Sequence, residues 1–537
     1  MIRATAVLAA AVCASVPGVP AAVSASVPGV TAAPVHVAWW GCGDGLECAK
    51  LSVPVDWARP RGPRTEIDLA RMPARDPARG LGPLVVSTGA ESTVQGVRAR
   101  PDAVSELARW FDVVFVEPRG IGDRGSAATV RCSVPQPDPR RLQLTPGPAA
   151  WRAHARDNAA YDRSCRIAAG PAYAGLTSWQ VAHDLDAVRA ALGQPRLRYF
   201  GNAYGAVFGQ AYLELFPRRV ERMYLEGVPD HGQPGVGRRL IAHARAAERQ
   251  LTAFRDWCAG RLGCPLGGDD AVEVLDGLLE RAPLPTGPGR AVAGRQPSAG
   301  LGPALGDRQT PAGPGQALDS RGIVVAVLAG LVPQRWPELA RALSAADAGD
   351  ASALAAMAAP GRPVAPATVT RALHCHDFMP AVPGYRRFLA MESRLRELAP
   401  RVGWLTGRYE IGRCLGITGR PSWPPRPAAL GNGLPTAARG GGEPSAGAAA
   451  RAVRGPAVLV GIGRLDLESP ASGAARVAGR IPEAAVLRHG DGHGAYLHQG
   501  TAKLRATCLR SRVHDFLVNG TPPRARTRCP GELTAVR

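Results

Sequence analysis

Short apolar strands alternate with amphipathic helices in two separated blocks of the chain, and this alternation is the strongest constraint on its fold. In the first block we expect strands at Pro83–Val86, Val113–Val116, Leu197–Phe200 and Arg222–Leu225, and helices at Thr177–Leu192 and Ala206–Phe216. In the second we expect strands at Ala457–Gly461 and Ala485–Leu487, and helices near Ser472–Arg480 and Ala502–Leu517. Such alternation is typical of an α/β fold with a mostly parallel sheet and helices on both faces.

Between the two blocks the pattern changes to helices broken by loops. We therefore divide the chain into a first core part at 34–230, an inserted helical cap domain at 231–454, and a C-terminal core part at 455–537. Pro, Gly, Ser and Ala dominate Pro283–Gly315 and Arg420–Gly455, so we expect disordered surface loops there. A helical insertion that interrupts a parallel sheet is the arrangement of a cap over an active site.

Residues 1–33 have the pattern of a secretory signal peptide. Arg3 precedes the apolar run Ala4–Ala14, which is too short to span a bilayer, and small-residue cleavage sites end at Ala25 or Ala33. Lipoprotein processing at Cys13 is the disfavoured alternative, because the preceding valine is bulkier than such sites prefer. No later stretch is apolar enough for a membrane helix, so we expect a secreted chain that does not act at a membrane.

The cysteine count agrees with export. Ten cysteines remain outside the signal, and an even number in an exported chain predicts disulfides. Their clustering favours pairing between neighbours, namely Cys42–Cys48, Cys132–Cys165, Cys258–Cys264, Cys375–Cys414 and Cys508–Cys529. The alternative is a metal site, for which His374-Cys375-His376 is the densest candidate. No C-x-x-C occurs, so we expect no metal.

The formal net charge of +21 suggests an acidic partner at first sight. Only Lys50 and Lys503 are lysines, however, and the arginines are scattered rather than arranged in blocks with interleaved aromatic residues. This pattern predicts a solvated arginine-rich surface and no nucleic-acid partner, with polyanion binding as a less favoured alternative. The sequence indicates no cofactor and leaves the oligomeric state open.

The segment Gly201-Asn202-Ala203-Tyr204-Gly205 lies between an expected strand and an expected helix. A G-x-S-x-G at such a place is a nucleophile elbow, in which a sharp turn exposes the serine and the flanking glycines avoid clashes. In a chain this rich in glycine and alanine, G-x-A-x-G alone is a weak signal. Its strand–turn–helix context strengthens it, and an intact elbow requires a strained, positive φ at Ala203.

Two further residues follow in the order nucleophile, acid, base. Asp466 comes after the strand Ala457–Gly461, and His493 comes after the strand Ala485–Leu487. Loops at the carboxyl ends of parallel strands meet at one edge of the sheet, so both side chains can reach the turn at Ala203. Either residue alone would be interpreted as an ordinary loop residue. Together with the elbow they predict a triad geometry.

Several longer segments carry a resemblance to a known family: Cys48–Pro60, Phe111–Gly122, His183–Arg189, Trp257-Cys258, Arg335–Pro337 and Gly520–Pro530. Through them the chain resembles the secreted actinobacterial tripeptidyl aminopeptidases, nearly end to end, although Glu117 stands where that family usually has aspartate. The resemblance implies an α/β-hydrolase fold with a large inserted helical cap. It also implies that Ala203, Asp466 and His493 occupy the nucleophile, acid and base positions, and that the capped pocket takes peptides or small amides and esters.

Two departures from the family pattern fall on the chemistry. Ala203 has no hydroxyl, and covalent acyl transfer needs a nucleophile hydrogen-bonded to the histidine. The family's glycine-rich oxyanion loop is replaced by Ser87–Gly96, in which Gly89 and Ala90 take the key place and Glu91 adds a carboxylate. The backbone amide of Tyr204 is the other expected oxyanion donor. A single Ser→Ala change is also what an engineered trap would carry, but the altered loop favours natural loss of catalysis.

These observations leave three hypotheses of different classes. The first is a secreted peptidase relative that is inactive or impaired, and the second is a protein that binds peptides or small molecules without turnover. The third is a residual hydrolase in which His493 activates water. Replacement of the nucleophile by Ser87 or Ser92 is disfavoured, because nothing in their spacing supports an approach to His493.

Overall fold

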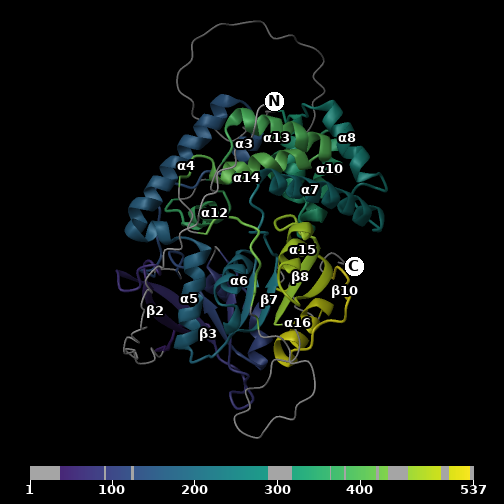
Figure 1. The fold of residues 1–537 in the computed structure, drawn as a ribbon. Helices are drawn as coiled ribbons and strands as arrows, with labels where there is room; N and C mark the ends of the chain where they lie inside the picture. Colours follow the sequence, from purple (N-terminus) through teal and green to yellow (C-terminus); the bar gives the residue numbers. More distant parts are fainter. Residues whose placement is uncertain are drawn as a thin grey trace, which may run out of the picture. The chain divides into compact units, whose positions relative to one another are not determined.

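The described residues form one sheet of ten strands in the order β1-β2-β3-β5-β4-β6-β7-β8-β9-β10 in this computed structural model (Figure 1). The structure describes residues 37–89, 92–122, 126–287, 317–362, 365–379, 382–418, 423–432, 434, 457–497 and 507–532. The expected signal peptide at 1–33 and most of the two Pro- and Gly-rich segments lie outside these residues.

The sheet has an antiparallel end and a parallel remainder. β3 pairs antiparallel with β2 and β5, whereas the neighbours from β5 through β10 run parallel. The six strands expected from the sequence correspond to β4 through β9. The bounds are β1 Trp40–Gly41, β2 Glu47–Pro54, β3 Arg64–Met72, β4 Pro83–Ser87, β5 Asp112–Val116, β6 Leu197–Asn202, β7 Val220–Glu226, β8 Val458–Leu465, β9 Ala485–Gly492 and β10 Arg528–Cys529.

The central strands are apolar throughout because helices cover both of their faces. In β4, Val85 belongs to the hydrophobic cluster on one face, while Leu84 and Val86 belong to the cluster on the other. The first cluster includes α5 (Ser178–Ala191) and α6 (Tyr204–Leu215), and the second includes α1 (Thr93–Ala99), α2 (Asp102–Ser105) and α16 (Cys508–Asn519). Successive strand side chains point to opposite faces, which explains why continuous apolar runs predicted these strands.

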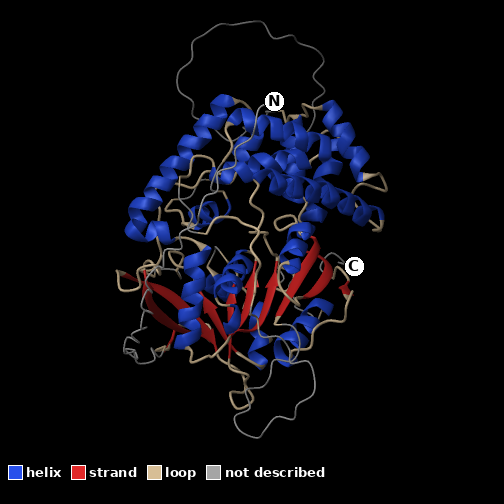
Figure 2. Ribbon diagram, viewed as in Figure 1, coloured by secondary structure: helices blue, strands red, loops and turns tan. Residues whose placement is uncertain are grey.

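A second layer of helices lies beyond the carboxyl ends of the parallel strands (Figure 2). Two of its helices, α3 and α4, precede the expected insertion at 231–454, and α3 packs against α9 and α14. The helices of this layer are α3 Arg140–Leu144, α4 Pro148–Ala169, α7 Val236–Ala259, α8 Ala271–Arg281, α9 Ser320–Gly330, α10 Trp336–Asp347, α11 Ser352–Ala358, α12 Thr370–Phe378, α13 Tyr385–Leu398 and α14 Thr406–Cys414. The remaining helix, α15 Ala471–Gly479, follows β8 in the core.

All five disulfides predicted from cysteine clustering are formed: Cys42–Cys48, Cys132–Cys165, Cys258–Cys264, Cys375–Cys414 and Cys508–Cys529. The fourth bond joins α12 to α14 within the helical layer. Cys375 is therefore not available as a metal ligand between its two histidine neighbours. Among the described residues, no group of three or more His, Cys, Asp or Glu is placed to hold a metal ion.

Part of the segment Arg420–Gly455 is held more firmly than its composition suggested. Trp423 is 2% exposed, and its ring stacks on His231 at a centroid distance of 3.6 Å. Its Nε1 donates a hydrogen bond to Glu214 on α6 at 2.8 Å. Trp423 and Leu430, both 2% exposed, thus attach this part of the segment to the core, which composition averaged over the segment does not reveal.

No single helix in the described parts of the chain has the length and apolar composition needed to cross a membrane. One pair passes that test jointly, Ser320–Gly330 with Pro333–Asp347, but it is bent by 110° at the break.

The start of α6 lies unusually close to the end of β4. A Cβ placed on Gly205 would be 2.0 Å from the carbonyl oxygen of Ser87. We expect Gly205→Ala to lower the free energy of unfolding by about 1–3 kcal/mol, the usual cost of forced overpacking. Urea denaturation of the purified variant measures this.

Gly96→Ala is the matched control, because Gly96 lies in α1 with nothing within 4 Å of an added Cβ. Alanine there should stabilise the helix by up to about 1 kcal/mol. Equal effects of the two substitutions would contradict the close approach of α6 to β4.

Candidate active site

Ala203 occupies the sharp turn between β6 and α6. Its backbone has φ 53° and ψ −120°, a left-handed conformation that costs a non-glycine residue about 1–3 kcal/mol. The flanking glycines are required, since a Cβ on Gly201 would lie 2.6 Å from the carbonyl oxygen of Gly205. The Ala203 N–H donates to the carbonyl oxygen of Glu226 at 3.0 Å and so ties the turn to the end of β7. The turn therefore has the positive φ that an elbow requires, with a methyl group in place of the hydroxyl.

Asp466 and His493 come together directly after β8 and β9. Nδ1 of His493 lies 3.1 Å from both carboxylate oxygens of Asp466, an arrangement in which Nδ1–H donates to the buried carboxylate. The imidazole also packs on Gly227, where an added Cβ would lie 2.7 Å from Cε1 of His493. Asp466 further accepts the N–H of Ser469 at 2.7 Å, which fixes the loop after β8. Both residues are thus placed as an acid–histidine pair, and His493 lines the same cavity as Ala203.

A second carboxylate, which the sequence did not single out, faces the other nitrogen of His493. Oε2 of Glu468 lies 3.7 Å from Nε2, the atom that would face a serine in a triad. Burial lowers the pKa of His493, but attraction by Asp466 and Glu468 together with the Asp466 hydrogen bond outweighs burial and raises the pKa to about 10. At neutral pH, His493 is consequently an imidazolium that has no lone pair to accept a proton.

Three backbone amides of the oxyanion-side loop donate hydrogen bonds within the protein. Thr88 N–H donates to Oγ1 of Thr93, while the N–H groups of Thr93 and Val94 donate to the carboxylate of Glu117. Gly89 has φ 110° and allows the loop to lie close to the start of α6. A Cβ added to Gly89 would be only 2.4 Å from Cβ of Tyr204. Ala90 and Glu91 lie outside the described residues.

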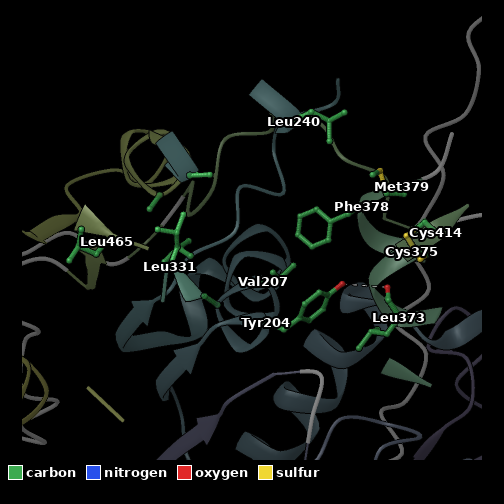
Figure 3. Close-up of a cluster of buried hydrophobic side chains, with 14 of the residues drawn as sticks. Tyr204, Val207, Leu240, Leu331, Leu373, Cys375, Phe378, Met379, Cys414 and Leu465 are labelled. Atoms are coloured by element: carbon green, nitrogen blue, oxygen red, sulfur yellow. Dashed lines mark hydrogen bonds between the residues drawn. A yellow bond between two sulfur atoms is a disulfide. The ribbon is translucent and has the colours of Figure 1, made fainter. Parts of the chain in front are cut away.

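Tyr204 keeps the backbone position of an oxyanion donor, because it is the first residue of α6 and its N–H has no intrahelical partner. Its side chain reaches in the other direction. The hydroxyl donates to Asp377 at 2.6 Å and lies 3.4 Å from the carbonyl oxygen of Leu373, both on α12 (Figure 3). Burial raises the pKa of Asp377 to about 7, opposed by hydrogen bonds from Ser178 and Tyr204. The elbow is thereby attached to the helical layer above it.

Glu117 holds the N-terminus of α1. Besides the two amides, its fully buried carboxylate accepts the hydroxyl of Ser92 at 2.7 Å, and Ser92 in turn caps Gln95 N at 3.2 Å. Ser92 lines the cavity, but its hydroxyl is engaged with Glu117 and the N-terminus of α1. Ser87 is 1% exposed beneath the elbow and does not line the cavity. Neither serine contacts His493, whose polar partners in the described part of the chain are Asp466 and Glu468.

The site opens into a cavity of about 790 Å³ between the strand ends and the helical layer. Ala203, Tyr204, Glu468 and His493 line its core side, and residues of α7, α12 and α14 line its other wall. Figure 3 shows Tyr204 and Phe378 projecting toward one another at this junction, and their ring centroids lie 5.8 Å apart. A cavity of this size suits a ligand of drug-like or short-peptide dimensions.

The charge state of His493 is directly measurable. We expect its imidazole resonances to titrate with a midpoint near pH 10 in a histidine-selective NMR spectrum. Because this folded pKa lies above the ordinary 6.5, the stabilisation is complete below pH 6.5 and is lost as pH rises toward 10. Glu468→Gln should lower the midpoint, whereas Glu280→Gln on the exposed side of α8 should leave it unchanged. A midpoint near 6.5 in the unsubstituted protein would contradict the double carboxylate contact.

Known proteins with similar sequences agree with this geometry. A family model described as TAP-like protein matches residues 439–529. Serine protease Hip1 of Mycobacterium tuberculosis is 28% identical over 515 residues, covering 90% of this chain and 87% of that protein. Tripeptidyl aminopeptidase of Streptomyces coelicolor is 28% identical over 273 residues, covering 49% of this chain and 48% of its own length. Carboxylesterase B of Mycobacterium tuberculosis is 30% identical over 242 residues, covering 42% and 44%.

The resemblance inferred from the motifs is thus supported by the family model and by the Streptomyces and mycobacterial relatives. The mostly parallel sheet, the turn after β6 and the inserted helical layer agree with it. In sequence and in fold the chain is therefore similar to the tripeptidyl aminopeptidase-like α/β-hydrolases.

Proposed function

We propose that this chain is a catalytically inactive member of its family that binds a peptide or small amide-like or ester-like ligand in the cavity without hydrolysing it. The observation that carries the proposal is the pairing of a methyl group at Ala203 with a histidine whose Nε2 faces the carboxylate of Glu468. The turn that should present a nucleophile presents none, and the base that should activate it is already protonated.

The first support is the absent hydroxyl. Acyl transfer by this kind of triad begins with attack of the serine oxygen, and no covalent intermediate forms without it. In subtilisin, a comparable triad, loss of the serine costs about 10⁶ in kcat. The relatives are a serine protease, a tripeptidyl aminopeptidase and a carboxylesterase, and all three activities are hydrolyses of acyl compounds. The chain retains the scaffold for such ligands and lacks the reacting atom.

The second support argues against direct water activation. A water held by His493 needs a neutral imidazole that can accept its proton. With a pKa of about 10, the imidazole is protonated at neutral pH, because Asp466 and Glu468 flank both nitrogens. A base with that pKa is neutral in only about one molecule in 10³ at pH 7. The two carboxylates thus keep the imidazole of His493, which would act as the base, protonated and positively charged.

The same proposal includes export of the chain. Five disulfides distributed over the core and the helical layer are stable in an oxidising compartment and uncommon in a reducing one. The apolar N-terminal run after Arg3 supplies the expected signal. Edman sequencing of the protein recovered from the medium of an expressing host tests this part, and a mature N-terminus after Ala25 or Ala33 is the expected result.

A set of four proteins tests the loss of catalysis: the native chain, Ala203→Ser, Glu468→Gln and the double variant. We expect neither the native chain nor Glu468→Gln to be labelled by a fluorophosphonate probe or to release p-nitroaniline from a tripeptide anilide. The double variant should act faster than Ala203→Ser at pH 7, because removal of Glu468 takes away one of the two carboxylates that raise the pKa of His493.

Each outcome has a definite meaning. Labelling or turnover by the native chain would contradict an inactive protein. If both serine-containing variants fold but remain inactive, the loop that contains Gly89 has also lost its oxyanion function. Circular dichroism spectra of the four proteins provide the folding control.

A further inference from the structure

The helical wall of the cavity carries a cluster of positive charge that the proposed loss of catalysis does not explain. Three guanidinium groups line this wall: Arg239 from α7, Arg371 from α12 and Arg413 from α14. One carboxylate, that of Glu410 on α14, lines it as well. These residues come from three different helices, so their convergence on one cavity is a property of the fold and not of a local run of sequence.

The polar contacts of Arg239 and Arg413 distinguish them from Arg371. Arg239 is 7% exposed and its guanidinium lies over the ring of Phe378 at 4.3 Å. Within the described part of the chain, neither arginine forms a salt bridge or donates a side-chain hydrogen bond. Arg371 differs, because it donates to the carbonyl oxygen of Pro137 and to Oδ1 of Asn158. Two guanidinium groups therefore line the cavity without donating a hydrogen bond to the described residues.

The neighbouring histidines do not change the balance of charge. Burial lowers the pKa of His374 well below 6.5, and the nearby guanidinium groups lower it further. Burial also lowers the pKa of His243. Nε2 of His374, a residue 7% exposed on the cavity wall, has no hydrogen-bond partner among the described residues.

Glu410 does not neutralise the cluster. Burial raises its pKa, but attraction by His243, Arg413 and Arg239 outweighs burial, and the pKa lies below its usual value. One ionised carboxylate against three guanidinium groups leaves an excess of positive charge. Asp230, another acid that lines the cavity, is already paired with Arg476 at 2.9 Å and Arg480 at 3.2 Å. An uncompensated buried charge is costly, so a site of this kind is stabilised by an anion.

From this geometry we propose that the cavity holds a ligand through a carboxylate group, which Arg239 and Arg413 bind opposite the turn at Ala203. The proposal rests on the proposed binding function and specifies its ligand class. A guanidinium matches a carboxylate through two parallel N–H···O bonds, and the apolar face of Phe378 keeps the fork of Arg239 in place. The free Nε2 of His374 supplies a further polar contact for the same group. A purely cationic ligand would meet the excess positive charge and is disfavoured.

Isothermal titration calorimetry with matched acid and amide pairs tests the proposal. The probes are trialanine and trialanine amide, which share the peptide, and hexanoate and hexanamide, which share the alkyl chain. We expect at least one acid to bind at least about tenfold tighter than its amide, a difference of about 1.4 kcal/mol. Preference within the peptide pair identifies a peptide C-terminus as the ligand group, and preference within the hexanoate pair alone identifies a non-peptide acid. No preference in either pair overturns the proposal.

Charge-removing variants locate the subsite. Arg239→Gln and Arg413→Gln should each reduce the acid-over-amide preference by about tenfold or more, whereas Arg239→Lys should retain part of it because the charge remains. Arg245→Gln is the matched control, since Arg245 lies exposed on the same helix α7 and does not line the cavity. Equal loss in the Arg245 control overturns the assignment of the subsite.

Mass analysis of the calorimetry cell separates this inference from the proposed function. Intact trialanine after incubation, together with a preference for the acid, supports both. Cleaved trialanine contradicts the inactive protein while leaving the carboxylate preference to be judged on the hexanoate pair. If Arg239→Gln fails to fold by circular dichroism, Arg413→Gln decides the result, because Arg413 is only half-buried.

Discussion

The turn at Ala203 is the constraint on which the rest of the site depends. It brings the ends of β4, β6 and β7 together, because Gly205 lies against Ser87 and the Ala203 amide is bonded to Glu226. The φ of 53° at Ala203 serves no catalytic purpose for an alanine side chain. The strained conformation persists because the packing around the turn holds the backbone in it. A strained turn of this kind normally presents a nucleophilic side chain. Ala203 supplies no such side chain, although the backbone has the conformation that would present one.

The charges around the turn differ from those of a working triad, although the backbone keeps the conformation of an elbow. In a working triad, one carboxylate orients the imidazole and Nε2 stays free to take a proton. Here Glu468 faces Nε2 and His493 is held as a cation between two acids. On the opposite wall, Arg239 and Arg413 leave positive charge unused. This arrangement of fixed charges is what the proposed binding function without turnover requires.

Much of this structure was predictable from the sequence, because periodicity and turn chemistry are local. The apolar runs of β4 to β9, the five disulfides and the strand–turn–helix around Ala203 all follow from residues close in the chain. The contact between Glu468 and His493 was not predictable, since no spacing rule directs an exposed loop carboxylate at a ring 25 residues away. The same holds for α3 and α4 joining the helical layer, and for Trp423 anchoring its loop to α6. Each of these depends on packing between distant segments.

Native mass spectrometry of the unsubstituted protein with a short peptide acid tests its loss of catalysis most directly. Because no hydroxyl stands at Ala203, we expect a non-covalent complex whose added mass equals that of the intact peptide, with no covalent adduct and no peptide fragments accumulating over hours. A covalent acyl adduct, or steady release of fragments, would contradict a binding protein that has kept the fold of a hydrolase and lost its chemistry.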